Sequence, residues 1–150
     1  MSVNIGIIGL SKSGRTTIFN ALTRGEIDTG KYTPEGSTPH VGMAKVPEPR
    51  LKVLADMLHP KRVVPVSATY IDIGTSVKSI GGQLLTQLSS VDALINVVRA
   101  FRNESIPHIE GSLDTERDIA NMNLELIFSD LALLERRLDR IATSLKGAKP

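Results

Sequence analysis

The fold is decided by the stretch Gly9-Leu10-Ser11-Lys12-Ser13-Gly14-Arg15-Thr16, which has the glycine spacing of a phosphate-binding loop. A short apolar run, Val3–Ile8, precedes it and predicts a buried strand. The residues that follow, Thr16–Leu22, carry apolar side chains at helical spacing. A strand, a glycine loop and a helix in this order hold phosphate groups, because the loop N–H groups point inward and the positive end of the helix dipole lies behind them.

One residue of this loop departs from the usual pattern, G-x-x-x-x-G-K-[ST], because Arg15 stands where the motif has lysine. A planar guanidinium is longer than the compact ammonium group and cannot take its place without displacing something. We therefore expect phosphate binding with altered geometry at the γ-phosphate, and Thr16 to offer its hydroxyl to Mg²⁺. The residues expected to contact the nucleotide are Ser11, Lys12, Ser13, Gly14, Arg15, Thr16 and Thr17.

The composition of the chain excludes several other classes of protein. Its 150 residues suffice for one domain with a core, but the absence of cysteine excludes disulfide frameworks and thiolate metal sites. Its apolar runs are too short to span a membrane, and its start lacks the features of a secretory signal, so we expect a cytoplasmic protein. The net charge of +2 does not by itself indicate a nucleic-acid partner. We expect the basic residues Lys61, Arg62 and Arg99–Arg102 to lie on the solvated surface.

Apolar, β-branched runs alternate with helical patterns up to residue 113, which favours an α/β fold with a parallel-rich sheet. Strands are expected at Val3–Ile8, Val41–Val46, Val66–Asp72 and Ala93–Arg99, with the first, third and fourth buried on both faces. Helices are expected at Thr16–Arg24, Arg50–Leu58 and Leu84–Leu88. The Gly-, Thr- and Pro-rich segment between Gly25 and Pro39 has no periodicity and a length typical of a functional loop.

From Asp114 onward the pattern changes to a heptad repeat. Its apolar seam consists of Leu124, Ile127, Leu131, Leu134, Leu138, Ile141 and Leu145. We predict a coiled-coil helix over residues 114–146, about 45 Å long, followed by a tail at residues 147–150. Asp114 is placed to cap this helix. Because the rest of its circumference is polar, the helix should project from the domain, and its seam should drive self-association.

Many segments along the chain resemble one family of nucleotide-binding proteins. They include Asn4–Leu10, Phe19–Thr23, Pro39–Gly42, Val46–Leu51, His59–Lys61, Tyr70–Ile73, Val97–Phe101 and His108–Gly111. In this order they resemble the Obg-like ATPases of the YchF subfamily, within the translation-factor-related P-loop NTPases. The resemblance implies an incomplete P-loop NTPase fold of the G-domain type over residues 1–113, with a projecting coiled-coil helix. It also implies GTP or ATP with Mg²⁺ as cofactors, and it is the sole indication of a ribosome or RNA partner. Family members return beyond this helix to finish the nucleotide domain and add a small TGS domain.

The switch regions of that family are altered here. Its D-x-x-G motif reads Asp72-Ile73-Gly74-Thr75, so that Thr75 replaces the glycine whose N–H would touch the γ-phosphate. In the first switch, an ungapped match puts Gly36 where the magnesium-binding threonine belongs and leaves Thr38 as a displaced substitute. With Arg15, three positions that sense the γ-phosphate are changed. The resemblance therefore implies an NTPase with weak or lost hydrolysis.

Two further polar residues have roles that the resemblance implies. Asp72 would reach Mg²⁺ directly or through water, together with Thr16 and Thr38, and the alternative is a turn aspartate at a strand end. His108 matches a histidine proposed as catalytic in the family, which would position or activate the attacking water. The alternative is a structural or solvated histidine. The other two histidines carry no comparable indication, and the three lack the spacing of a zinc site.

The sequence holds no base-recognition motif of the Asn-Lys-x-Asp type, so it leaves ATP and GTP undecided. The strands that would follow Ala93–Arg99 in the family are absent as well, which predicts an exposed apolar edge at this strand. Two functions follow from these observations. The first is nucleotide binding with impaired or absent hydrolysis, which the phosphate loop favours. The second is a non-catalytic interaction module that associates through its heptad helix.

Overall fold

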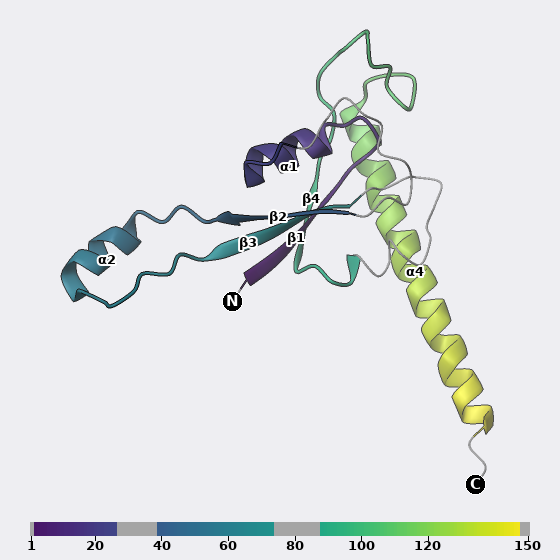
Figure 1. Ribbon diagram of the computed structural model, residues 1–150. Helices are drawn as coiled ribbons and strands as arrows, with labels where there is room; N and C mark the ends of the chain where they lie inside the picture. The colour runs from purple at the N-terminus through teal and green to yellow at the C-terminus, as the bar shows by residue number, and fades with distance from the viewer. Residues whose placement is uncertain (1, 27–38, 74–87, 148–150) are drawn as a thin grey trace.

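A computed structural model describes residues 2–26, 39–73 and 88–147 of the chain (Figure 1). The elements follow in the order β1 (Ser2–Ile8), α1 (Arg15–Thr23), β2 (His40–Lys45), α2 (Arg50–Leu58), β3 (Ser67–Asp72), β4 (Ala93–Asn96) and α4 (Thr115–Gly147). All four predicted strands are present within a few residues of the expected bounds. The predicted helix at Leu84–Leu88 lies almost wholly outside the described residues, as do Gly36, Thr38 and Thr75.

The strands form one sheet in the order β2-β3-β1-β4 (Figure 1). β1 pairs in parallel with both β3 and β4, so that Ile7 lies opposite Asp72 on one side and Ile95 on the other. β2 pairs with β3 in the antiparallel sense, with His40 opposite Asp72. The parallel pairing brings the carboxyl ends of β1, β3 and β4 to one edge, where the segments that follow them meet. The predicted parallel-rich α/β sheet is confirmed, with one antiparallel strand at its end.

The core is centred on β1. Ile7 and Ile8 are consecutive and therefore point to opposite faces of the sheet, yet both are essentially fully buried. Ile8 packs with Ile73 and with Met122 of α4. Helix α1 contacts β1, β2 and β3 and buries Phe19. Helices from distant parts of the sequence thus hold the strand that leads into the phosphate loop.

The prediction that the fourth strand is buried on both faces is wrong. β4 ends at Asn96, and Ala93, Leu94 and Asn96 are exposed. β4 stands at the end of the sheet order, so within the described residues no strand pairs with its outer edge. A continuous apolar run identifies a strand, but its burial depends on neighbours that the run does not specify.

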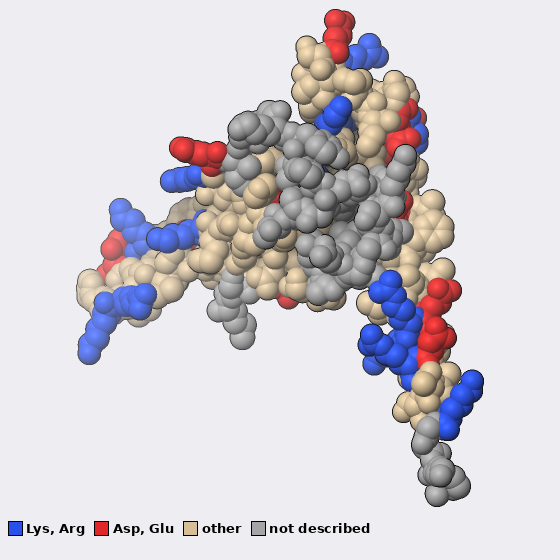
Figure 2. Space-filling model, turned by 45° about the vertical axis from the view of Figure 1, so that its right-hand side comes forward, with Lys and Arg blue, Asp and Glu red and all other residues tan. Residues whose placement is uncertain are grey.

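Two helices project from the sheet (Figure 1). Helix α2 stands at the tip of an arm between β2 and β3 and buries none of its residues. Helix α4 starts beside the sheet, where Met122 is buried, and extends away until Leu138 and Leu145 are 65% and 70% exposed. Its start is capped as predicted, because the backbone N–H of Arg117 donates to Asp114 Oδ1 at 3.0 Å. Lys and Arg side chains lie beside Asp and Glu on its projecting end (Figure 2).

Within the described ranges, none of the helices combines the length and apolar content that a membrane span requires.

Candidate nucleotide-binding site

The loop between β1 and α1 has the backbone of a phosphate cradle. Gly9, Lys12 and Gly14 have φ angles of +150°, +64° and +100°, in the region that glycine adopts most readily. A Cβ at Gly9 would also overlap the carbonyl oxygen of Val97, whereas one at Gly14 would meet no atom within 4 Å. The loop therefore curls tightly against the chain that leaves β4, and only glycine fits at its first position.

The N-terminus of α1 is arranged to receive an anion. Its N-cap is Gly14, which offers no side chain, and its first turn holds no acidic residue. The N–H of Ile18 donates to the carbonyl oxygen of Gly14 at 3.0 Å, and the N–H groups before it precede the regular helical hydrogen bonds. The hydroxyl of Ser13 is buried with no hydrogen-bond partner in the part of the chain that the structure describes. These donors are those that a phosphate group would bind.

Asp72, the last residue of β3, lies beside the start of α1. Thr16 Oγ1 donates to Asp72 Oδ2 at 2.9 Å, and Nδ1 of His40 lies 3.8 Å from the same oxygen. The carboxylate is buried, and among described residues its Oδ1 has no hydrogen-bond partner. A buried carboxylate oxygen without a partner is costly, and a hard cation with its bound water would satisfy it. Thr16 and Asp72 therefore fit a magnesium ion, whereas Thr38 lies outside the described residues.

Sequence reasoning missed His40, because the pattern gives no sign that the start of β2 will face the end of β3. The antiparallel register of the two strands brings His40 opposite Asp72. Its ring also contacts the ring of Phe19, with centroids 6.3 Å apart. His40 is therefore a neighbour of the candidate metal site.

Arg15 turns toward the end of β3. Its Nη1 donates a hydrogen bond to the carbonyl oxygen of Ile73. Burial lowers the pKa of the guanidinium, and the nearby carboxylate of Asp72 opposes this shift. The contact ties α1 to the residue that follows β3. The guanidinium therefore lies against the end of β3 in this arrangement.

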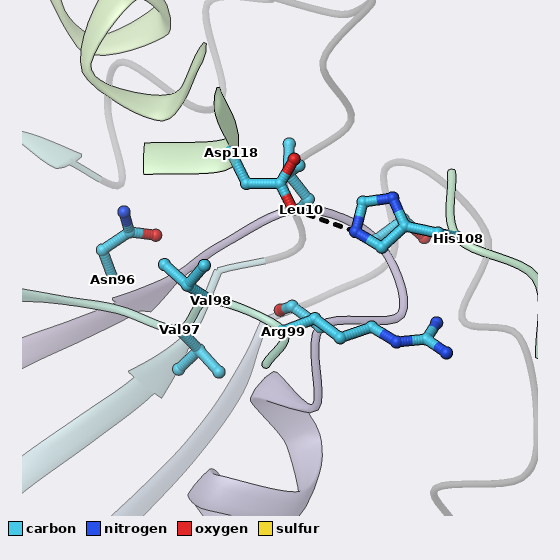
Figure 3. Close-up of a pocket in the computed structure, with 9 residues that line it drawn as sticks. Leu10, Asn96, Val97, Val98, Arg99, His108 and Asp118 are labelled. Carbon is cyan, nitrogen blue, oxygen red and sulfur yellow. Dashed lines mark ion pairs between the residues drawn. The ribbon is translucent and has the colours of Figure 1, made fainter. Parts of the chain in front are cut away.

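The structure places His108 beside the phosphate loop. A small pocket brings together Ser11 and Ser13 of the loop, His108, and Asp118 of α4 (Figure 3). Residues 96–99, at the end of β4 and directly after it, line its other side. His108 Nε2 lies 2.9 Å from Asp118 Oδ2, and both side chains are buried. The predicted catalytic histidine and the predicted phosphate loop therefore share one pocket, and the catalytic role itself remains a prediction.

Arg99 also lines this pocket, and its predicted place on the solvated surface is wrong, because it is only 4% exposed. Its guanidinium donates to the carbonyl oxygens of Phe101, Asn103 and Ile106, at 3.1, 3.4 and 2.8 Å. It also lies 4.8 Å from the centre of the Phe101 ring. The buried side chain of Arg99 thus holds together, by hydrogen bonds, the segment that leads to His108. A single arginine after a strand carries no sequence signal that separates this role from an exposed one.

Together, the loop between β1 and α1, the threonine that opens α1 and the buried aspartate that ends β3 identify the class of protein. The chain is part of a P-loop domain of the G-domain type, in which β2 runs antiparallel to β3 and the phosphate loop follows β1.

Comparison with known proteins bears on the family resemblance. No protein-family model matches the chain. It is similar to the ribosome-binding ATPase YchF of Bacillus subtilis (strain 168), with 36% identity over 152 residues that cover 97% of this chain and 42% of the relative. The ribosome-binding ATPase YchF of Escherichia coli O157:H7 is 35% identical over 153 residues, 98% of this chain and 42% of the relative. That of Buchnera aphidicola subsp. Schizaphis graminum (strain Sg) is 29% identical over 155 residues, 99% of this chain and 43% of the relative.

The comparison confirms the resemblance to the YchF subfamily seen in the sequence, because relatives named YchF match nearly the whole of this chain at 29% to 36% identity. The chain spans less than half the length of these curated relatives.

Proposed function

We propose that this chain binds a purine nucleotide, ATP or GTP or the corresponding diphosphate, with Mg²⁺ at the loop from Gly9 to Thr16. The main observation behind the proposal is the hydrogen bond that Thr16 Oγ1, at the end of this loop, donates to Asp72 Oδ2 at 2.9 Å. The second oxygen of Asp72 is buried and has no hydrogen-bond partner in the described ranges, which supports a bound cation there. The names of the relatives, which are called ATPases, support a nucleotide as the ligand.

The roles of the residues follow from their positions. Ser11–Thr17 would contact the nucleotide phosphates, with the backbone of the loop and the start of α1 as the main donors. Thr16, Asp72 and Thr38 would hold Mg²⁺, which when bound neutralises charge on the phosphate oxygens. His108 would address the attacking water from the pocket that it shares with the loop.

Hydrolysis is proposed to be weak or absent. Arg15 is hydrogen-bonded to the carbonyl oxygen of Ile73, and we propose that it gives up this contact when it reaches a γ-phosphate. The changes at Gly36 and Thr75 affect two further positions that the family uses to sense this phosphate. Binding of the α- and β-phosphates relies on the loop backbone, which has the expected curl. We therefore propose that diphosphates bind nearly as well as triphosphates.

Isothermal titration with ATP, GTP and their diphosphates, with and without Mg²⁺, tests this function. The variant Asp72→Asn should lose the gain in affinity that Mg²⁺ gives the wild type, because an amide is a much weaker ligand for a hard cation. Asp56→Asn is the matched control, because Asp56 is an exposed acid on the distant arm helix α2. Equal magnesium dependence in the wild type and in Asp72→Asn would exclude the metal role of Asp72.

We also propose that α4 associates with a second copy of itself. All seven residues of its heptad seam, from Leu124 to Leu145, are at least 49% exposed, which supports a partner helix on this face. The same surface would serve the alternative function, a non-catalytic interaction module. Association with a ribosome is proposed from the name of the relatives, which are called ribosome-binding, and cosedimentation with purified ribosomes tests it.

A further inference from the structure

The buried pair of His108 and Asp118 joins the segment after β4 to the first turns of α4 (Figure 3). Their side chains are 8% and 3% exposed, and His108 Nε2 lies 2.9 Å from Asp118 Oδ2. The other ring nitrogen, Nδ1, accepts the backbone N–H of Glu110 at 3.1 Å. A ring nitrogen that accepts a hydrogen bond carries no proton. This hydrogen bond leaves Nε2 as the ring nitrogen that carries the proton, facing the carboxylate.

The carboxylate of Asp118 is itself held in place. Its Oδ1 accepts two hydrogen bonds from Arg117, from Nε at 3.2 Å and from Nη2 at 2.9 Å. Arg117 is anchored in turn by the backbone carbonyl and the hydroxyl of Ser112, at 2.7 and 2.9 Å. Asp118 Oδ2 is buried and accepts no hydrogen bond from a described residue, and Nε2 of His108 faces it at 2.9 Å.

Resting on the proposed function, we infer that Asp118 is the positioning residue for His108. It keeps the imidazole proton on Nε2 and so makes Nδ1 the basic nitrogen of the ring. It also holds the ring in the pocket beside Ser11 and Ser13. Because Asp118 belongs to α4, the placement of this helix sets the placement of the imidazole.

The arrangement also determines what has to change for His108 to act on water. Nδ1 can accept a proton from water only after the N–H of Glu110 releases it. That N–H lies in a turn closed by the hydrogen bond from Gly111 N–H to the carbonyl oxygen of His108, at 3.1 Å. Gly111 has a φ of +77°, which suits glycine. The turn from His108 to Gly111 is therefore the part that would rearrange, while Asp118 keeps its hold on Nε2.

Long-range proton–nitrogen NMR of the full chain with ¹⁵N-labelled histidine tests the assignment, because it distinguishes protonated from unprotonated ring nitrogens. The variant His108→Gln identifies the signals of His108 among those of three histidines. At neutral pH the wild type should show His108 as a single tautomer with the proton on Nε2. A wild-type spectrum with the proton on Nδ1, or with a mixture of tautomers, would overturn the inference without any variant of Asp118.

Variants of Asp118 supply the second reading. Asp118→Asn keeps an acceptor oxygen and should retain the single tautomer, whereas Asp118→Ala should lose it and show an average of both. Glu116→Gln is the matched control, because this exposed acid lies in the same turn of α4. A spectrum of Asp118→Ala with the wild-type tautomer pattern would refute the role of Asp118.

Nucleotide hydrolysis separates this inference from the proposed function. Where the wild type hydrolyses nucleotide, Asp118→Ala should lower kcat about 10- to 100-fold with KM changed less than about twofold, and Asp118→Asn should recover part of the loss. A change in KM with unchanged kcat would overturn the positioning role. A wild type without hydrolysis would remove the catalytic part of the proposed function, and the tautomer of His108 would still decide the assignment of Asp118.

Discussion

Replacement of Arg15 by lysine should raise the affinity of the chain for nucleoside triphosphates or its rate of hydrolysis. In the structure the guanidinium donates to the carbonyl oxygen of Ile73, at the end of the strand that carries Asp72. A lysine would place a compact ammonium group at the loop and would lack the planar fork that makes this contact. Its charge would then be available to the β- and γ-phosphates, as in the usual motif.

The size of the effect follows from the contact that is lost. A hydrogen bond from a charged donor contributes about 1.5–3 kcal/mol, and we propose that Arg15 gives up its bond to Ile73 to reach a phosphate. Since about 1.4 kcal/mol corresponds to a tenfold change in affinity, this competition weakens triphosphate binding roughly 10- to 100-fold. Arg15→Lys should recover most of that factor. The gain should be smaller for diphosphates, because the loop backbone supplies most of their contacts.

Calorimetric titration with ATP and GTP, together with phosphate release at saturating nucleotide, measures both quantities. Arg102→Lys is the control, because it makes the same chemical change at an exposed residue outside the loop. A variant Arg15→Lys with neither tighter triphosphate binding nor faster hydrolysis would refute the claim that Arg15 is the limiting defect. The altered positions Gly36 and Thr75 would then account for it.

Three further predictions concern the fold and its surface. The double variant Leu131→Glu/Leu138→Glu should sediment as a monomer and the wild type as a dimer, since burial of each aliphatic seam residue is worth up to about 1.5–3 kcal/mol; a monomeric wild type would exclude a heptad-driven dimer. Arg99→Met should lower the free energy of unfolding, measured in urea, by about 2–4 kcal/mol, because the three carbonyl groups that this residue binds lose their hydrogen-bond donor. An unchanged midpoint of urea unfolding would contradict the structural role of Arg99. Gly9→Ala should lower the free energy of unfolding by about 2–4 kcal/mol, and Gly14→Ala by about 1–2 kcal/mol. Both changes place a side chain at an unfavourable φ, but only that at Gly9 also clashes with the carbonyl oxygen of Val97. Equal losses in thermal melts would contradict the close approach of Gly9 to Val97.

Local patterns in the sequence were sufficient to predict the elements that build the phosphate loop. The apolar run before Gly9 and the helical spacing after Gly14 both reflect short-range rules, and the structure has a strand and a helix at these places. The heptads likewise predicted one long helix, which begins at Thr115, directly after the capping residue Asp114. Each of these sequence patterns lies within the strand or helix that it predicts.

The residues that the sequence did not reveal depend on contacts between distant segments. Arg99 is buried because the chain after β4 wraps around it, and His40 faces Asp72 because two strands pair in one register. Asp118 faces His108 because the start of α4 packs beside the segment that carries the histidine. The exposed faces of β4 have the same origin, since the burial of a strand's faces is set by what packs on them, whereas its place at the end of the sheet order, among the described strands, matches the edge expected from the sequence.

The central claim is that the loop from Gly9 to Thr16 binds a nucleotide with Mg²⁺ through Thr16 and Asp72. Calorimetric titration of the wild type with ADP, GDP, ATP and GTP, in the presence of Mg²⁺ and then of EDTA, tests it most directly. We predict saturable binding with one site per chain, tighter with Mg²⁺, and a diphosphate affinity within about tenfold of the triphosphate affinity, because the grip on the α- and β-phosphates comes from the loop backbone. The absence of heat and of saturable binding for all four nucleotides, with the chain shown to be folded, would contradict the account.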